Sequence, residues 1–232
     1  MSNLVALHGF LGKPDDWNFL HPSFNVHALD LSDPQFESKG LVESATIINA
    51  FAKKIPSPRI LLGYSLGGRL ALHALISDPH LWEEAIIISS HPGLETEKEK
   101  QERLQNDEQW AERFLKDSWN NLMADWNKQS VFNNQPAKSQ RKESDYSRKN
   151  LAEMLRNWSL GRQKNLKKEI EELTIPLLWI AGEKDTKFST LAKTLRLRNK
   201  KSKVWLAPQA GHRVPWEVQE EFIQFIKEGV HV

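Results

Sequence analysis

The chain has 232 residues, of which 39% are hydrophobic and 27% are charged, and its formal net charge at pH 7 is +2. This balance is ordinary for a globular protein, and the small net charge gives no general basic field that would favour nucleic acid or an anionic membrane as a partner. The absence of cysteine excludes disulfides, thiolate metal sites and cysteine nucleophiles. Because no apolar run approaches the ~20 residues of a membrane span and the N-terminus lacks the pattern of a signal peptide, we expect a cytoplasmic protein.

Short apolar runs alternate with helical patterns over the first 93 residues. The runs predict strands at 4–7, 26–29, 60–62 and 85–88, and the helical patterns lie at 44–55 and from residue 70 onwards. Strands that alternate with helices are typical of βαβ units, so the sequence predicts a parallel sheet.

The third strand runs directly into the pattern G-x-S-x-G, from Gly63 to Gly67, which is followed by a strong helix-forming segment. This arrangement is the sequence form of a nucleophile elbow, a sharp turn from strand to helix that exposes a serine. We expect Gly63 and Gly67 to remove side chains that would clash in the turn, and Gly68 to let the helix approach the sheet. Ser65 is the predicted nucleophile or base.

Strand-like runs are absent between residues 95 and 160, where the chain is charge-dense and helical. Its amphipathic spacings include Trp110 with Phe114, and Trp119 with Trp126, which must pack against other parts of the protein. The α/β pattern then returns, with strands at 177–181 and 203–206, a helix at 189–198 and a last helix after residue 218. The sequence therefore predicts one α/β domain, residues 1–93 and 161–232, with a helical lid inserted at 94–160.

A serine hydroxyl reacts only if an imidazole takes its proton and an acid orients that imidazole. In an α/β hydrolase the three groups follow strands in the chain order Ser, Asp or Glu, His. Ser65, Asp185 and His212 satisfy both the order and the placement after strands, and they are the predicted catalytic residues.

Each partner of the serine has rivals. Glu183 shares the loop of Asp185 and is the weaker candidate for the acid. His8 and His91 also follow strands, but both precede the acid in the chain, and we expect His8 to brace its own loop. The expected oxyanion donors are the backbone N–H groups of Leu66 and Phe10. No group of His, Asp and Glu has the spacing of metal ligands, so we expect no metal.

The motifs together resemble the α/β-hydrolase superfamily. They are L-H-G-F-L-G at 7–12, G-Y-S-L-G-G-R at 63–69, G-E-K-D at 182–185 and A-G-H at 210–212. The set is similar to that of the 2-succinyl-6-hydroxy-2,4-cyclohexadiene-1-carboxylate synthase family of menaquinone biosynthesis. The features that narrow the resemblance are Tyr64, Arg69 and the stretches at 102–110, 125–126 and 159–162.

The resemblance implies a lyase that eliminates pyruvate from 2-succinyl-5-enolpyruvyl-6-hydroxy-3-cyclohexene-1-carboxylate without a cofactor. The Ser–His–Asp unit would act as the base, and the oxyanion site would stabilise an enolate. Guanidinium groups suit the three carboxylates of this substrate. The matching substrate-binding residues are Tyr64, Arg69, Arg103, Trp126 and Arg148, with Arg162 as a rival to Arg148.

Two other functions use the same residues. A carboxylesterase or thioesterase would form a covalent acyl-serine at the same elbow, because the elbow serves both chemistries. A binding protein of this fold that has lost catalysis is disfavoured, since serine, acid and histidine are all present. The expected partner is a small polycarboxylate, and the expected state is a monomer, with a small homo-oligomer as the alternative.

Overall fold

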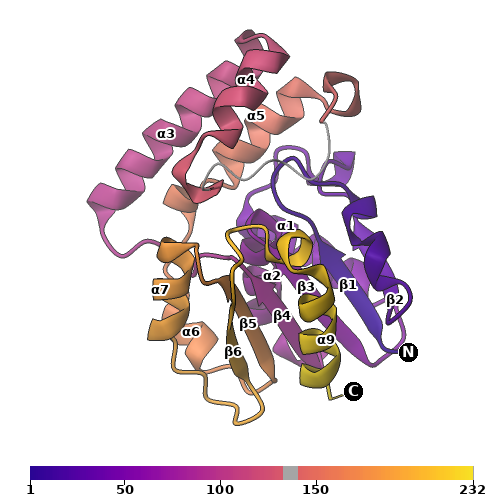
Figure 1. Cartoon of the computed structure of the whole chain (residues 1–232). Coiled ribbons are helices and arrows are strands. Elements are labelled where there is room, and N and C mark those ends of the chain that lie inside the picture. Colours follow the sequence, from indigo (N-terminus) through magenta and orange to yellow (C-terminus); the bar gives the residue numbers. More distant parts are fainter. Residues whose placement is uncertain (133–140, 232) are drawn as a thin grey trace.

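Six parallel strands form one sheet, as predicted, in the order β2-β1-β3-β4-β5-β6 (Figure 1). The computed structural model describes residues 1–132 and 141–231. The strands are β1 (Asn3–Leu7), β2 (Asn25–Leu29), β3 (Arg59–Tyr64), β4 (Glu84–Ile88), β5 (Leu177–Gly182) and β6 (Lys203–Ala207). Each contains the residues predicted for it, because buried parallel strands read as continuous apolar runs.

The register of the sheet brings the carboxyl ends of neighbouring strands to one edge. Gly63 of β3 lies beside Leu7 of β1 on one side and Ile87 of β4 on the other. Since all the strands run in the same direction, the loops after β1, β3, β4, β5 and β6 emerge at this edge, where ligands bind in open α/β sheets.

Helices cover both faces of the sheet (Figure 1). The long helices of the core are α1 (Leu41–Ala52), α2 (Leu66–Ser77), α7 (Thr186–Thr194) and α9 (Gln219–Gly229). Ile60 and Leu62 of β3 pack on the side of α9, whereas Leu61 between them packs on the side of α1 and α2. This alternation follows from the two-residue period of a strand. The shorter helices are α6 (Lys167–Glu171), α8 (Val214–Glu217) and the 3-10 helices Pro14–Leu20, Pro34–Phe36, Pro79–Leu81, Ser130–Phe132, Glu143–Asp145 and Leu160–Arg162.

Two helices begin three residues earlier than predicted because of their N-terminal caps. The N–H of Gly40, at the start of α1, donates to the carboxylate of Glu43 at 2.8 Å. At the start of α7, the side chain of Asp185 accepts a hydrogen bond from the N–H of Phe188 at 3.4 Å. Such caps satisfy N–H groups that have no partner within the helix.

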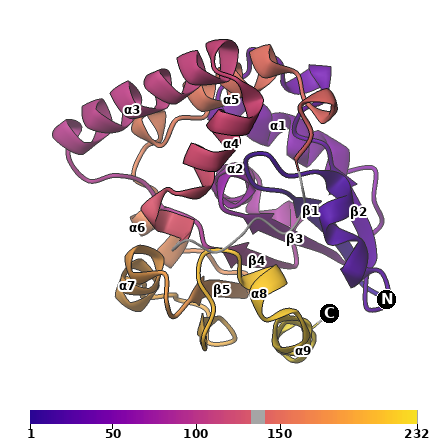
Figure 2. The same cartoon turned by 45° about the horizontal axis from the view of Figure 1, so that its top comes forward.

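Between β4 and β5 the chain forms three further helices, α3 (Glu97–Lys116), α4 (Trp119–Asn127) and α5 (Arg148–Asn157). They lie over the carboxyl edge of the sheet, as Figures 1 and 2 show from two directions. Arg156 of α5 joins α5 to α3 through ion pairs with Glu108 at 2.7 Å and Glu112 at 2.6 Å. No helix in the described ranges, 1–132 and 141–231, is both long and apolar enough to cross a membrane.

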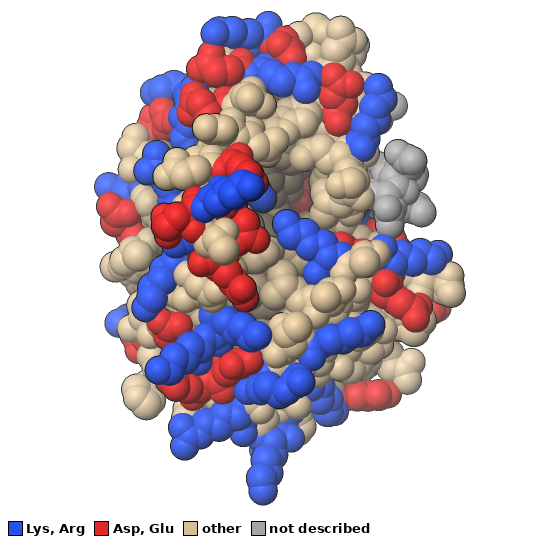
Figure 3. Space-filling model, turned by 90° about the vertical axis from the view of Figure 1, so that its left-hand side faces the viewer, with Lys and Arg blue, Asp and Glu red and all other residues tan. Residues whose placement is uncertain are grey.

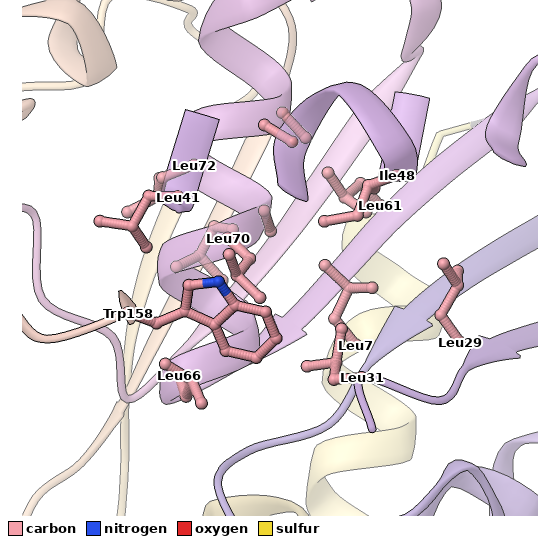
Figure 4. Packing of buried hydrophobic residues seen from close by; sticks show 14 of the residues in the cluster. Leu7, Leu29, Leu31, Leu41, Ile48, Leu61, Leu66, Leu70, Leu72 and Trp158 are labelled. Atoms are coloured by element: carbon pink, nitrogen blue, oxygen red, sulfur yellow. The ribbon is translucent and has the colours of Figure 1, made fainter. Parts of the chain in front are cut away.

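Trp158, just after α5, fixes the end of this insertion to the core. Its indole lies near Leu66 and Leu70 of α2 (Figure 4), and its Nε1–H donates to the hydroxyl of Ser44 in α1 at 3.0 Å. A buried tryptophan with its N–H satisfied contributes a large apolar area without an unpaired polar group.

The insertion leaves and re-enters the core at one place, which we call the neck. The N–H of Leu166 donates to the carbonyl of Pro92 at 2.8 Å, and the side chain of Gln163 donates to the carbonyl of His91 at 3.0 Å. Gly93 has a φ of +134°, and a Cβ there would lie 2.6 Å from the carbonyl oxygen of Lys164. The two chain segments of the neck are therefore in backbone contact.

Candidate active site

Ser65 occupies the sharp turn between β3 and α2 and has the unusual backbone angles φ 52° and ψ −110°. A non-glycine residue with positive φ is strained, and such strain persists only where the surroundings hold it. Here the N–H of Ser65 donates to the carbonyl of Ile88 at 2.8 Å, and the hydroxyl of Ser90 donates to the carbonyl of Ser65 at 3.1 Å. The end of β4 thus holds the elbow in place.

The glycines around Ser65 are required by close packing, as the sequence predicted. A Cβ at Gly67 would lie 2.5 Å from the carbonyl oxygen of Leu7, and closer still to that of His8. A Cβ at Gly63 would lie 2.7 Å from the carbonyl oxygen of Gly67. These neighbours are backbone atoms, which cannot move aside as a flexible side chain does.

The structure brings Ser65, His212 and Asp185 together in one hydrogen-bonded chain. The Oγ of Ser65 is 3.0 Å from Nε2 of His212, and Nδ1 of His212 is 2.7 Å from Oδ2 of Asp185. Asp185 and His212 are each only 4% exposed. An ionised carboxylate only accepts hydrogen bonds, so Nδ1 carries the hydrogen and Nε2 is left to accept the proton of Ser65. This is the geometry in which a serine can lose a proton.

The rivals of these residues have other contacts. Glu183 is exposed, and its carboxylate accepts a hydrogen bond from the N–H of Gln209 at 3.4 Å. The Nε2 of His8 accepts the N–H of Leu31 at 3.0 Å, so its Nδ1 donates to the carbonyl of Gly9 at 2.8 Å. His8 therefore braces its own loop, as expected.

Glu217 contacts the histidine loop in a way that the sequence reading missed. Its two carboxylate oxygens accept the N–H of Gly211 at 2.6 Å and the N–H of Arg213 at 2.9 Å. These are the residues on either side of His212. Glu217 ends the four-residue helix α8, and no local motif marks such a contact.

A cavity of about 540 Å³ opens beside Ser65 and His212, within the range of small-ligand sites. Figure 3 shows a hollow on the face of the molecule that it draws, bordered by Lys and Arg as well as by Asp and Glu side chains. Phe10 and Leu66 both line the cavity with Ser65. Leu66 is the first residue of α2, so its N–H has no carbonyl partner within the helix, as an oxyanion donor requires.

Arg69 lines the cavity from α2 and is 7% exposed. Its guanidinium donates to the carbonyl of Trp158 at 2.7 Å and to the side chain of Gln163 at 3.3 Å. Burial, together with the nearby charge of Arg103, lowers the pKa of Arg69 to about 9. An anion in the cavity would offset this cost of burying a cation.

Arg103 lines the same cavity from α3 and is held by Asp107. The Nε of Arg103 lies 2.8 Å from both carboxylate oxygens of Asp107, which is 3% exposed. Asp107 also accepts the hydroxyl of Ser159 at 2.7 Å. The paired carboxylate therefore orients the guanidinium, whose terminal nitrogens make no hydrogen bond to residues 1–132 or 141–231.

Arg148 does not line the cavity. Its Nη1 donates to the carbonyls of Phe114 and Asp117 at 2.9 and 2.7 Å, and its Nε donates to Glu143 at 2.6 Å. Arg148 thus satisfies carbonyls at the end of α3, a common role of basic side chains. Its rival Arg162 is also away from the cavity lining, with its Nε donating to the carbonyl of Arg156 at 2.8 Å.

Two other basic residues lie on the far side of Ser65, in a smaller cavity of about 80 Å³ that shares Phe10, Ser65 and His212 with the first. Arg141 and Arg213 line it, and neither was singled out from the sequence. The Nη1 of Arg141 is buried and makes no hydrogen bond to the described part of the chain. Burial lowers the pKa values of both arginines, and their mutual repulsion lowers that of Arg213 further.

Aromatic side chains form the remaining walls. Trp126 lines both cavities, with its ring 4.8 Å from that of Phe10. Tyr64 lines the smaller one, with its ring 5.6 Å from that of His212 and 4.9 Å from that of Trp216. Burial raises the pKa of the Tyr64 hydroxyl, so it stays protonated and able to donate.

Within residues 1–132 and 141–231, no three His, Cys, Asp or Glu side chains are grouped in a way that could hold a metal ion. The ionisable groups in the two cavities are mainly basic, and Ser65 and His212 line both cavities. Such a site can bind an anion with several carboxylates and remove a proton from it.

The chain matches the alpha/beta hydrolase fold family over residues 3–217. A 2-succinyl-6-hydroxy-2,4-cyclohexadiene-1-carboxylate synthase of Photorhabdus laumondii is 33% identical, over 90% of this chain and 78% of the relative. One of Escherichia coli O1:K1 is also 33% identical, over 90% of this chain and 86% of its own length. The solved structure of MenH from S. aureus has a TM-score of 0.86 at 26% identity, and the match covers 98% of this chain and 92% of that one.

Proposed function

The chain belongs to the 2-succinyl-6-hydroxy-2,4-cyclohexadiene-1-carboxylate synthase family of the α/β-hydrolase fold, and we propose that it eliminates pyruvate from 2-succinyl-5-enolpyruvyl-6-hydroxy-3-cyclohexene-1-carboxylate. One observation carries the proposal: the hydrogen-bonded chain of Ser65, His212 and Asp185 ends between two cavities lined by arginines. A base among fixed cations suits the removal of a proton from a polyanion, because the cations stabilise the added negative charge.

The proton transfer begins at Ser65. Its Oγ passes a proton to Nε2 of His212 and takes one from C2 of the substrate ring, which is next to the succinyl carbonyl. Asp185 stabilises the imidazolium that forms, as in other serine triads. The N–H groups of Phe10 and Leu66 serve as donors to the resulting enolate oxygen.

The electrons then move through the ring. The pair left at C2 forms a C2–C3 double bond, the C3–C4 double bond moves to C4–C5, and the C5–O bond breaks. Pyruvate leaves as its enolate and takes up a proton to become the ketone, while the imidazolium of His212 gives up the proton that it gained, so that Ser65 and His212 are ready for another turnover. Atoms balance without an oxidant, a reductant or water, and no bond forms between Ser65 and the substrate.

The arginines bind carboxylates of the substrate, which has three. Arg69 and Arg103 serve on one side of Ser65. On the other side Arg141 takes the role expected of Arg148, since Arg141 lines a cavity and Arg148 does not. Tyr64 and Trp126 hold the ring between the two groups of cations. A guanidinium is well suited to each carboxylate because it donates in a planar fork.

Residues 94–160 act as a lid over this site. The support for this role is that Arg103 of α3 and Trp126 of α4 line the cavity together with core residues, so the site is complete only with the insertion in place. A cytoplasmic location and a monomeric state stay predictions from the sequence.

The test is pyruvate release from the enolpyruvyl substrate by the wild type, Ser65→Ala and Ser77→Ala. Ser77 lies at the other end of α2, so its variant controls for the loss of a hydroxyl. We expect Ser65→Ala to lower kcat about 10³-fold, in line with a general base, and Ser77→Ala to match the wild type. Hydrolysis of a p-nitrophenyl ester without elimination would instead show an esterase.

A further inference from the structure

Two residues of the larger cavity have no part in the proton transfer described above. His91 follows β4, and Lys187 lies in the first turn of α7. The ring of Phe188 connects their surroundings to the reacting groups, since it lies 6.2 Å from the ring of His91 and 4.8 Å from that of His212. The wall of the cavity between β4 and α7 is therefore connected to the reacting groups through Phe188.

The hydrogen bonds of His91 fix which of its nitrogens carries the hydrogen. Its Nδ1 is 3.1 Å from the N–H of Gly93, which can only donate, so Nδ1 is the acceptor. In a neutral imidazole the other nitrogen then carries the hydrogen. Nε2–H of His91 has no acceptor among the described residues, although the side chain lines the cavity.

Burial and the surrounding charges keep His91 neutral. Burial, together with the charges of Lys187, Arg69 and Arg103, lowers the pKa of His91 to about 3, and the carboxylate of Glu99 in α3 opposes this shift. At neutral pH the side chain is therefore a hydrogen-bond donor that adds no charge to an already cationic wall.

Lys187 supplies a positive charge near His91. No carboxylate in the described part of the chain lies within ion-pair distance of the Lys187 ammonium, which lies over the ring of Phe188 at 5.9 Å from its centroid. Burial and the charge of Arg103 lower the pKa of Lys187, and the more distant carboxylates of Asp185 and Glu99 oppose this shift. A lysine that lines a cavity among other cations, without an anion of its own, is stabilised by an anionic ligand.

We propose that Lys187 and His91 form a carboxylate-binding subsite on the wall between β4 and α7. Its ligand is one carboxylate of the polycarboxylate substrate, which accepts hydrogen bonds from the ammonium of Lys187 and from Nε2–H of His91. This inference rests on the proposed elimination only for the identity of the substrate, because any di- or tricarboxylate presents the same group. The carboxylate stays charged throughout the reaction, so the subsite binds substrate and transition state alike.

The kinetic test uses Lys187→Gln, Lys187→Arg and His91→Phe, with Lys193→Gln, at the exposed end of the same helix, as the control. We expect Lys187→Gln to raise KM about tenfold and His91→Phe about fivefold, with kcat within about twofold of the wild type, as expected for the loss of uniform binding. Lys187→Arg keeps the charge and restores most of the affinity. An unchanged KM in both Lys187→Gln and His91→Phe overturns the subsite.

A binding measurement separates this inference from the proposed function. Calorimetry with propane-1,2,3-tricarboxylate, on the wild type and Lys187→Gln, does not depend on turnover. Weaker binding by the variant supports the subsite even if the protein eliminates no pyruvate, in which case the proposed function falls alone. Equal binding by the two proteins, with normal elimination by the variant, removes the subsite and leaves the proposed function standing.

Discussion

Glu217 holds the backbone on both sides of His212, with its carboxylate oxygens 2.6 Å from the N–H of Gly211 and 2.9 Å from that of Arg213. A carboxylate can accept from both N–H groups at once, and these charge-assisted bonds are stronger than neutral ones. The position of the imidazole relative to Ser65 therefore depends on a residue that does not touch the substrate cavity.

Glu217→Gln replaces one acceptor oxygen with an NH₂ group that faces a backbone N–H. We expect kcat for pyruvate release to fall about tenfold with little change in KM, since the loss of one such hydrogen bond costs about 1.5–3 kcal/mol and part of that cost appears as a displaced His212. Glu220→Gln, an exposed change in α9, is the control. A Glu217→Gln protein with wild-type kcat would mean that the loop holds His212 without this contact.

Asp185→Asn separates the two roles of Asp185, which caps α7 and accepts the hydrogen bond of His212. Asparagine is a good helix cap, so the hydrogen bond to the N–H of Phe188 persists and the melting temperature should change by only a few degrees. The amide cannot stabilise an imidazolium, and it favours the wrong tautomer of His212. We expect kcat to fall about 10³- to 10⁴-fold, as for the acid of other triads. Paired measurements of kcat and thermal unfolding test this, and equal losses in both would show a structural role alone.

Arg103→Ala and Arg148→Ala test which of the two arginines binds the substrate and which stabilises the end of α3. Arg103→Ala should raise KM about ten- to a hundredfold, because a charged hydrogen-bond donor to the substrate is lost. Arg148→Ala should leave KM unchanged and lower the free energy of unfolding by about 1–3 kcal/mol, because the carbonyls of Phe114 and Asp117 lose their donor. Steady-state kinetics and urea denaturation give the two values. A raised KM for Arg148→Ala would return that residue to the binding site.

Gly67→Ala should prevent the elbow from forming. The added Cβ overlaps the carbonyls of Leu7 and His8, so we expect a loss of more than 3 kcal/mol in unfolding free energy, or insoluble protein. Gly40→Ala is the matched change, because the atom nearest its Cβ belongs to the flexible side chain of Glu43. That variant should lose only about 1 kcal/mol, because the added Cβ displaces no more than the side chain that caps α1. Similar stability of the two proteins, measured by urea denaturation, would contradict the packing at Gly67.

His73 makes stability depend on pH below neutrality. Burial, together with the nearby charge of Arg69, lowers the pKa of His73 to about 4 from the ordinary 6.5, and its Nε2 has no partner in the described part of the chain. Between these values the unfolded chain binds more protons, so the unfolding free energy decreases as the pH falls from 6.5 towards 4.

His73→Leu should reduce this slope by up to about 1.4 kcal/mol per pH unit, which is the contribution of one proton. The change removes a buried polar atom that has no hydrogen bond, so the stability at pH 7.5 should be kept. Urea denaturation of both proteins from pH 7.5 to pH 4.5 measures the slope. Parallel curves for the two proteins would contradict the lowered pKa, because they would show that His73 binds its proton equally well in the folded and the unfolded state.

The sheet and the hydrogen-bonded triad could be predicted because their signals are local. The apolar run of β3 and the glycines around Ser65 lie within a few residues of one another, and the order of Asp185 and His212 follows from the topology. The helix starts at Leu41 and Thr186 differ from the prediction because the caps at Gly40 and Asp185 extend each helix by about one turn beyond its apolar pattern.

The lining of the cavities could be predicted only in part. Arg148 and Arg141 are seven residues apart in the same polar stretch, and only the packing of α3 decides which of them faces Tyr64. His91 and Lys187 follow carboxyl ends of strands, which is a usable signal, but chain order alone shows only that His91 is a poor candidate for the triad histidine. The contact of Glu217 depends on how α8 packs against the histidine loop.

The closed neck has a consequence for how this protein could diversify. Because Pro92 and Leu166 are joined by a backbone hydrogen bond, the 73 residues between them can change in length or sequence without changing the spacing of β4 and β5. Ser65, Asp185 and His212 all lie outside that segment, whereas Arg103 and Trp126 lie within it. Exchanging the segment between homologues would thus alter which substrate is accepted while leaving the proton-transfer residues in place, so chimaeric proteins joined at the neck offer a route to new specificities.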